Sequence, residues 1–248
     1  MINIEIRPEY VAHIKGLLIT NTFLTSLLTT FIVSVFAIIF YFNRKKRKRK
    51  SLLFNGIKVL IYNLLKLTET VVQDKKLARK ILPLIATFFL FIVTANLLAL
   101  FPGFLGSFFV KTAQGKIVLL RSPNSDLTTT LALALFSVIS IQFFSLRVLG
   151  IKNYLARFFN FANPVNFFIG FFEILSEATK IFSFSFRLFG NILSGEVLLL
   201  IIGFLVPYII PLPFMVLEIF VGIVQAFIFS ALTLTFIKTS TIRHLTKI

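Results

Sequence analysis

The stretch that decides the fold of this chain is residues 167–205, FFIGFFEILSEATKIFSFSFRLFGNILSGEVLLLIIGFL. It is strongly apolar, with only a few polar residues along its length. About 39 residues at a rise of 1.5 Å each would form a helix of roughly 58 Å, nearly twice the ~30 Å hydrocarbon thickness of a bilayer. We therefore expect a membrane helix that tilts steeply, bends or extends beyond the bilayer.

Most polar residues of this stretch lie along one side of the predicted helix. They recur about every seven residues or lie near that line, and they are Glu173, Glu177, Lys180, Ser183, Arg187, Asn191 and Ser194. Arg187 is permanently charged, and a charge at bilayer depth costs from about 3 to more than 10 kcal/mol. A chain rarely keeps such a residue without a function for it, so Arg187 indicates ion or proton handling.

Glu196 lies on a different side of the same helix. Nine residues at about 100° each place it roughly opposite Arg187 and about 13 Å further along the axis. This spacing excludes a simple ion pair between the two within the helix. It predicts two separate polar environments, one on each side of the helix.

Composition extends the membrane assignment to the whole chain. Apolar residues make up 57% of the 248 residues, and the mean hydropathy is +0.94. The long apolar segments are 17–42, 81–101, 127–150, 167–205 and 213–238. Their continuous character excludes an outer-membrane barrel, whose strands alternate in polarity. We predict an all-α polytopic membrane protein with one membrane domain (1–248), about five membrane helices, and a hairpin of the fourth and fifth over 167–238.

The distribution of positive charge predicts the orientation. Residues 43–80 hold thirteen of the twenty-six Lys and Arg residues, including the run 44–50, so this basic loop should lie on the inner side. Five spans then place the N-terminus and the turn at 206–212 outside and the C-terminus inside. A basic block beside a membrane span is typical of a topology signal with affinity for anionic lipid, and nucleic-acid binding is not expected.

The fifth segment supplies two more polar residues. Glu218 and Gln225 are seven residues apart and share a helix face. In a hairpin about 206–212, Glu218 falls near the level of Glu196, and Gln225 nearer that of Arg187. Two carboxyls this close at low dielectric should carry fewer than two negative charges at neutral pH. Such a pair can pass protons.

Simpler explanations exist for several of these residues. Asn191, Ser183 and Gln225 could each form only a hydrogen bond between helices. Glu173 and Lys180 could be an interfacial ion pair. The chain has no cysteine and its two histidines, His13 and His244, lie near opposite termini, so we expect no metal site and no cofactor.

Several stretches match one family in the right order. The specific one is RLFGNILSGE (187–196), followed by the proline-rich turn and VQAFIFSALT (224–233). Weaker matches are NLLALFP (96–102), SPNSDLTTTLALAL (122–135) and FANPVNFF (161–168). With these residues the chain closely resembles subunit a of the F-type ATP synthase.

The resemblance implies a proton-conducting stator subunit that is not itself an enzyme. Its expected partners are a ring of small c-type subunits that each carry a carboxyl, b-type subunits of the peripheral stalk, and membrane lipid. Two offset aqueous half-channels would deliver protons to the ring and remove them. A stand-alone ion channel or secondary transporter is the alternative. The expected location is a bacterial plasma membrane, with an organellar inner membrane as the other possibility.

The resemblance also implies roles for individual residues. By motif position Arg187 is the essential arginine that faces the ring. The residues implied for the outer half-channel are Glu196, Glu218, Asn191, Gln225 and Asp126, and those for the inner half-channel are Glu173 and Ser183. Some relatives have histidine in place of Glu196 or Glu218, whereas this chain has glutamate at both positions. The resemblance leaves open the coupling ion, the ring size and the net direction of the reaction.

Overall fold

The computed structural model describes residues 10–14, 17–45, 52–100, 109–112, 115–118, 121–158, 164–206 and 209–241. Five of its helices are long and apolar enough to cross a membrane, which confirms the predicted number of spans and the all-α membrane architecture. The helices are α1 (Asn21–Lys45), α2 (Leu52–Val72), α3 (Lys75–Leu100), α4 (Leu127–Leu149), α5 (Ile151–Phe158), α6 (Pro164–Leu205) and α7 (Pro211–Thr241). A short 3-10 helix, η1 (Pro123–Ser125), precedes α4.

Two short antiparallel hairpins accompany the helices. One pairs β1 (Tyr10–Ile14) with β2 (Leu17–Thr20), and the other pairs β3 (Phe109–Thr112) with β4 (Gly115–Val118). The sequence patterns did not predict them. Both lie outside the apolar helices, so they leave the membrane architecture unchanged.

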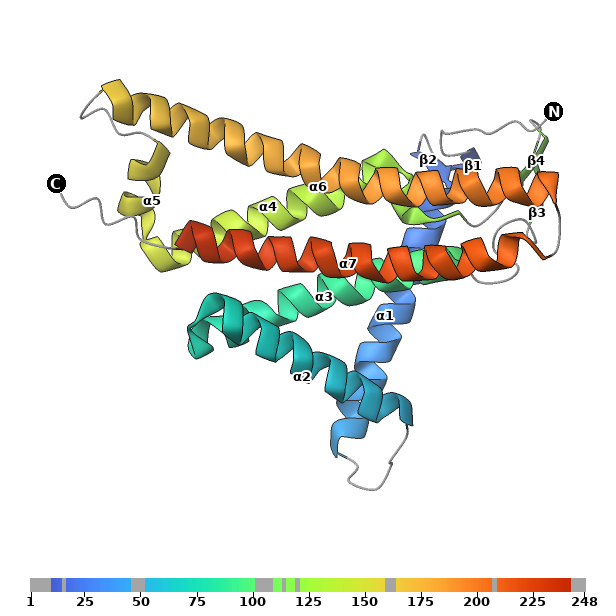
Figure 1. Ribbon diagram of the computed structural model, residues 1–248, viewed down its shortest axis with the longest axis horizontal. Coiled ribbons are helices and arrows are strands. Elements are labelled where there is room, and N and C mark those ends of the chain that lie inside the picture. Colours follow the sequence, from blue (N-terminus) through green and yellow to red (C-terminus); the bar gives the residue numbers. More distant parts are fainter. Residues whose placement is uncertain are drawn as a thin grey trace.

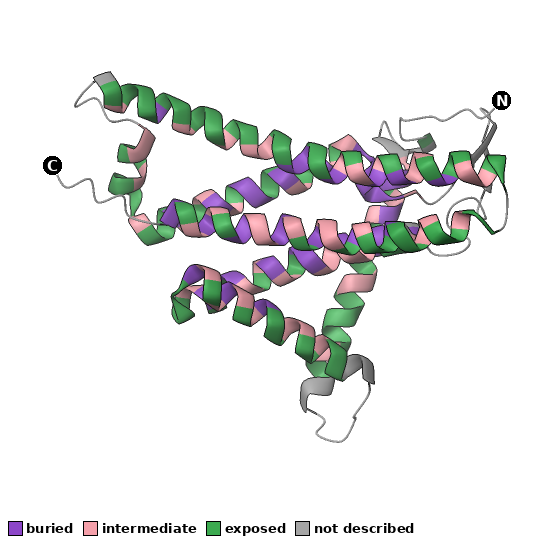
Figure 2. Ribbon diagram, viewed as in Figure 1, coloured by how far each residue is buried: buried purple, intermediate pink, exposed green. Residues whose placement is uncertain are grey.

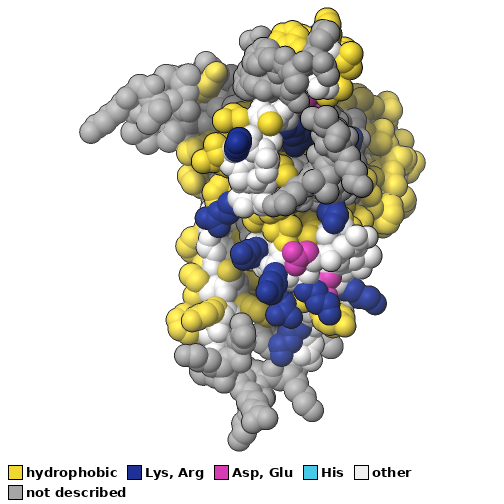
Figure 3. Space-filling view, turned by 90° about the vertical axis from the view of Figure 1, so that its left-hand side faces the viewer, with side chains coloured by type: hydrophobic (Ala, Val, Ile, Leu, Met, Phe, Trp, Pro, Cys, Tyr) yellow, Lys and Arg dark blue, Asp and Glu magenta, His cyan; other side chains and the backbone are white. Residues whose placement is uncertain are grey.

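The segments that connect the helices lie at two opposite ends of the molecule (Figure 1). Both β hairpins and the connection between α6 and α7 lie at one end, and α5, the turn between α2 and α3 and the end of α7 lie at the other. With the predicted orientation, the first is the outer end and the second the inner end. Figure 3 views the second end and shows Lys and Arg side chains gathered there, as the positive-inside rule expects.

The fourth membrane helix, α6, is continuous over 42 residues, or about 63 Å. It contacts α7 near the outer end and diverges from it toward the inner end, where α5 packs against it (Figure 1). Pro211 begins α7, where its missing amide hydrogen costs nothing. The predicted long fourth helix and the helix hairpin are therefore present.

The packed interior lies where α3, α4, α6 and α7 meet. Ile85 and Ile92 of α3, Leu188 of α6 and Leu234 of α7 are fully or almost fully buried. The ring of Phe229 lies 5.0 Å from that of Phe184 and 5.4 Å from that of Phe88, between centroids. This aromatic cluster joins three of the four helices.

Hydroxyl groups add hydrogen bonds between the same helices. Ser137 and Thr233 lie 2.9 Å apart, Thr130 and Ser185 lie 3.1 Å apart, and Ser145 donates to the carbonyl of Ser240 at 2.8 Å. All three contacts are buried. Because apolar surfaces gain little by leaving lipid for protein, such contacts and close packing hold membrane helices together.

The outward surfaces are apolar. Figure 2 shows mostly exposed positions along the outer faces of α1 and of the inner half of α6. Phe172 of α6 is 63% exposed and Phe31 of α1 is 66% exposed. Faces of this kind suit contact with lipid or with other membrane subunits.

The basic stretch 43–80 is not an irregular loop. Its middle forms α2, which packs against α3, and residues from Lys75 onward already belong to α3. Lys238 of α7 donates to the carbonyl of Val72 at 2.6 Å, which gives a hydrogen-bond partner to a carbonyl at the end of α2. The next residue, Gln73, has a positive φ of 60°. Most of the basic run 44–50 lies outside the described residues.

Candidate functional site

Arg187 lies on the exposed side of α6, near the middle of the helix. The neighbouring Phe184, Ser185 and Leu188 are buried against the bundle, whereas Arg187 turns outward. Its Nη2 donates to Ser183 Oγ at 3.3 Å, one helical turn away. No carboxylate among the described residues forms an ion pair with Arg187. The guanidinium is therefore open to a partner outside this chain.

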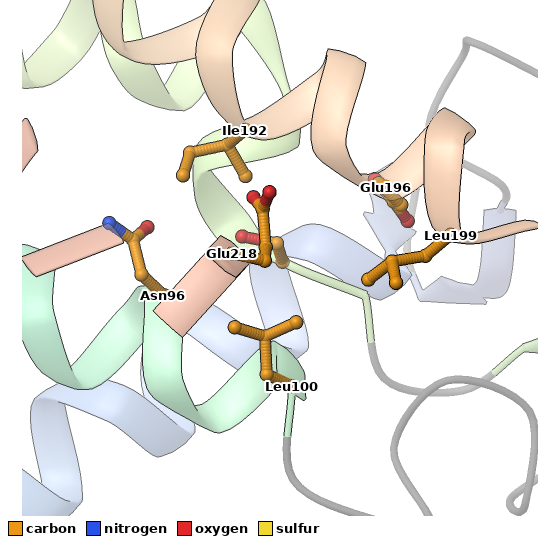
Figure 4. Close-up of a pocket in the computed structure, with 7 residues that line it drawn as sticks. Asn96, Leu100, Ile192, Glu196, Leu199 and Glu218 are labelled. Carbon is orange, nitrogen blue, oxygen red and sulfur yellow. The ribbon is translucent and has the colours of Figure 1, made fainter. Parts of the chain in front are cut away.

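Glu196 and Glu218 line one small cavity near the outer end, as the hairpin register predicts. The cavity measures about 20 Å³, enough for one water molecule. Its lining residues are Asn96, Leu100, Ser122, Ile192, Glu196, Leu199 and Glu218. Figure 4 shows the carboxyl of Glu218 pointing toward α6, close to Ile192. α3, α6 and α7 thus meet around two acidic side chains.

Gly195 makes room for the Glu218 carboxyl. A Cβ atom at position 195 would overlap the carboxyl group of Glu218. Glu218 is 9% exposed, and no hydrogen-bond partner for its carboxylate is found among the described residues. This buried acid therefore depends on water in the cavity or on its own protonation.

Arg121, a residue not expected from the sequence pattern, pairs with Glu196. Its Nε donates to Glu196 Oε1 at 3.1 Å and lies 3.3 Å from Oε2, and both side chains are only 12% exposed. One signal was available, because Arg121 directly precedes the SPNSDLTTT motif in the connection between the second and third apolar segments. Its partner Glu196 lies 75 positions away, so no local pattern could identify the pair.

Two asparagines form hydrogen bonds next to the cavity of Glu196 and Glu218. Asn124 of η1 donates to Asn96 Oδ1 at 2.6 Å, and Asn96 donates to the carbonyl of Gly222 at 3.0 Å. The side-chain oxygen of Asn124 is buried and has no hydrogen-bond partner among the described residues. These contacts join η1, α3 and α7 beside the cavity.

Asp126 caps α4. Its carboxylate accepts from the amide of Thr128 at 2.9 Å and from the hydroxyl of Thr22 in α1 at 3.0 Å. It is 8% exposed and occupies the N-cap position that carboxylates favour. Asp126 does not line the cavity with Glu196 and Glu218, so its expected position at the mouth of a proton path stays a prediction.

A network of ionised side chains lies at the inner end. Arg157 of α5 pairs with Glu173 and lies 3.7 Å from Glu177, while Lys180 donates to Glu177 at 2.7 Å. The suggested pair of Glu173 with Lys180 is therefore wrong, because each has a different partner. Arg157 was not expected from the sequence pattern, and it lies on the short helix α5 between the third and fourth apolar segments.

Three buried polar atoms of this network have no protein partner among the described residues. They are Gln142 Nε2, Arg157 Nη1 and Glu177 Oε2. Tyr154 donates to Gln142 Oε1 at 3.0 Å. Burial, followed by the negative charge of Glu177, raises the pKa of Tyr154, so its hydroxyl stays protonated. Unpartnered polar atoms at one place favour ordered water there.

The two predicted polar residues between these regions are Asn191 and Gln225. Both are partly buried, and neither side chain makes a hydrogen bond within the described part of the chain. The structure thus does not support the simple hydrogen bond between helices for either residue. Among the described residues, no group of three or more His, Cys, Asp or Glu side chains could hold a metal ion.

The fold and these sites define a class: a polytopic helical membrane protein with ionisable residues at both ends of its bundle and an outward-facing arginine between them. The chain belongs to the ATP synthase A chain family, whose family model matches residues 23–238. A match over most of the chain confirms the resemblance carried by residues 187–196.

Individual relatives agree. The chain is 35% identical over 165 residues to the ATP synthase subunit a of Moorella thermoacetica, a match that covers 65% of either chain. It is 36% identical over 192 residues to ATP synthase subunit a 2 of Bradyrhizobium sp., covering 77% of each. The match to the Helicobacter pylori subunit a has 34% identity over 219 residues and covers 85% of this chain and 88% of that protein.

Proposed function

We propose that this chain is the proton-translocating stator subunit of an F-type ATP synthase. The observation that carries the proposal is the placement of Arg187 between two polar regions of α6. Glu196 lies nine residues toward the outer end, about 13 Å along the helix axis, and Glu173 lies fourteen residues toward the inner end, about 21 Å along it. The arginine faces outward from the subunit, whereas Glu196 and Glu218 face an internal cavity.

In this mechanism the two regions belong to separate half-channels. A proton from the outside reaches the cavity of Glu196 and Glu218, with Asn191 and Gln225 further along its path, and then a carboxyl on a neighbouring moving subunit. Glu173, with Ser183 beside Arg187, serves release toward the inner side. Since the two regions are offset along α6, a proton that enters at one does not reach the other directly.

Arg187 would couple the transfer to motion. A fixed cation stabilises the ionised form of a nearby carboxyl, so a ring carboxyl must release its proton before it passes. The same charge repels protons that would leak between the half-channels. Movement of the ring is then the permitted route, and the chain itself catalyses no covalent reaction.

The proposed partners follow from the exposed face of Arg187. A ring of c-type subunits, each with a membrane carboxyl, would cover that face, and b-type subunits of the peripheral stalk and lipid would cover others. The relatives named above all come from bacteria, which supports a bacterial plasma membrane.

The test uses the assembled synthase in sealed membrane vesicles. Arg187→Ala should abolish ATP synthesis driven by a proton gradient while the subunit remains inserted and assembled. Arg147→Ala is the matched control, because Arg147 is also exposed, on α4, and lies over the ring of Phe143 at 4.5 Å. Normal coupled synthesis by the Arg187→Ala enzyme would contradict the proposal. Ion conduction by the purified chain alone, without a co-purifying ring, would favour the stand-alone channel instead.

A further inference from the structure

We propose that Arg121 is a positioning residue that neutralises Glu196 and holds it at the edge of the cavity, which leaves Glu218 as the carboxyl that takes up the proton. This inference rests on the proposed function. It assigns different roles to Glu196 and Glu218, which the sequence pattern does not distinguish.

The geometry distinguishes the two carboxyls. Glu196 faces the Arg121 guanidinium, with Nε within 3.1 and 3.3 Å of its two oxygens. Glu218 lines the same cavity from α7 and has no cation as a partner among the described residues. The other polar groups around it are the amide of Asn96 and the hydroxyl of Ser122, neither of which is titratable.

The different surroundings of Glu196 and Glu218 favour different charge states of their carboxyls. A carboxylate bonded to guanidinium at low exposure is stable in its ionised form. A second carboxyl beside it, without a cation of its own, is stabilised by a proton because two adjacent negative charges repel. The cavity between them has room for one water molecule that could deliver that proton.

The position of Arg121 also suits this task. It precedes η1, and the hydrogen bonds of Asn124 and Asn96 fix η1 to α3 and α7. Arg121 is therefore anchored next to the cavity by the segment that follows it. Its guanidinium cannot easily follow Glu196 away from the cavity.

The deciding experiment is a rescue in the assembled enzyme, measured as proton-driven ATP synthesis in vesicles. Glu196→Gln alone removes the carboxylate that Arg121 holds while the guanidinium stays close to the cavity of Glu218, and we expect a loss of about tenfold or more. Glu196→Gln with Arg121→Gln removes both charges together, and this double variant should recover to within about threefold of the unmodified enzyme. Arg121→Lys should keep most activity, since it preserves the positive charge.

Two results would overturn the inference. A double variant as inactive as Glu196→Gln would show that Glu196 itself must carry the proton. Glu218→Gln with near-normal synthesis would show that Glu218 does not carry it. The Arg187→Ala enzyme separates this inference from the proposed function. If Arg187→Ala is inactive and the double variant is also inactive, only the role of Arg121 is wrong. If Arg187→Ala is active, the proposed function is wrong as well. Immunoblots of the membranes confirm equal amounts of subunit.

Discussion

Gly195 of α6 lies directly against the carboxyl group of Glu218 in α7. The contact needs a residue without a side chain, because any Cβ atom at position 195 would occupy the space of the carboxylate. A glycine in the middle of a long helix costs about 1 kcal/mol relative to alanine. Here it lets an acidic side chain reach the surface of the neighbouring helix.

Gly195→Ala should therefore impair proton transfer more than stability. The carboxyl is the far end of a flexible side chain, so it can move aside, and the fold should survive. Displacing it from the cavity should lower proton-driven ATP synthesis by about tenfold. Gly203→Ala is the control, because a Cβ atom at position 203 would meet no atom of the described residues within 4 Å apart from its own helix backbone and chain neighbours. Equal synthesis by the two variants would show that the position of the Glu218 carboxyl is unimportant.

Two substitutions of Asp126 separate its observed cap from its expected place in a proton path. Asp126→Ala removes the acceptor for Thr128 and Thr22 and should lower the stability of the detergent-solubilised complex by roughly 1–3 kcal/mol. Asp126→Asn keeps an acceptor for the cap, so it should be milder and should retain proton-driven synthesis. If Asp126→Asn abolished synthesis while the complex stayed stable, a direct role in the proton path would be supported.

The inner network makes Arg157 sensitive to substitution. Arg157→Gln leaves Glu173 without its cation and deprives Glu177 of one of two. We expect less assembled complex or slower synthesis by a few fold, since a partly buried carboxylate without its partner is unfavourable. Combining it with Glu173→Gln should restore assembly toward that of Glu173→Gln alone. Lys152→Gln, at an exposed position of α5, is the control and should have no effect.

Lys238 should stabilise the turn between α2 and α3. Its ammonium group donates to the carbonyl of Val72, the last residue of α2. Lys238→Met keeps the length of the side chain but removes the donor. Hydrogen exchange at the amides around Gln73 should become faster, because the end of the helix loses its cap. Lys75→Met, an exposed position next to the same turn, should leave exchange there unchanged.

The sequence was most informative about the membrane helices. Apolar segments long enough to span a bilayer specified the five spans, and the prolines near 211 specified the turn between α6 and α7. Helix periodicity placed Arg187 opposite Glu196, and the spacing about the turn brought Glu218 to the level of Glu196. These inferences use only distances along one helix or across one short connection, where geometry leaves little freedom.

The helices α2 and α5 could not be recognised in the same way. Both lie in basic segments that a membrane-span criterion classifies as loops, and α5 has only eight residues. α2 packs against α3, and α5 packs against α4 and α6, which supplies the contacts that short or interfacial helices need. Propensity alone did not distinguish them from irregular connections.

The sequence by itself determined that this chain has five helices long and apolar enough to cross a membrane, with an arginine and several carboxyls along them, because hydropathy and helix period are properties of contiguous residues. Only the tertiary structure decided which charges meet. Arg121 pairs with Glu196, Arg157 pairs with Glu173, and Arg187 pairs with no described carboxylate. The physical reason is range: an ion pair requires atoms within about 4 Å, and segments distant in sequence come that close only through packing of the whole bundle.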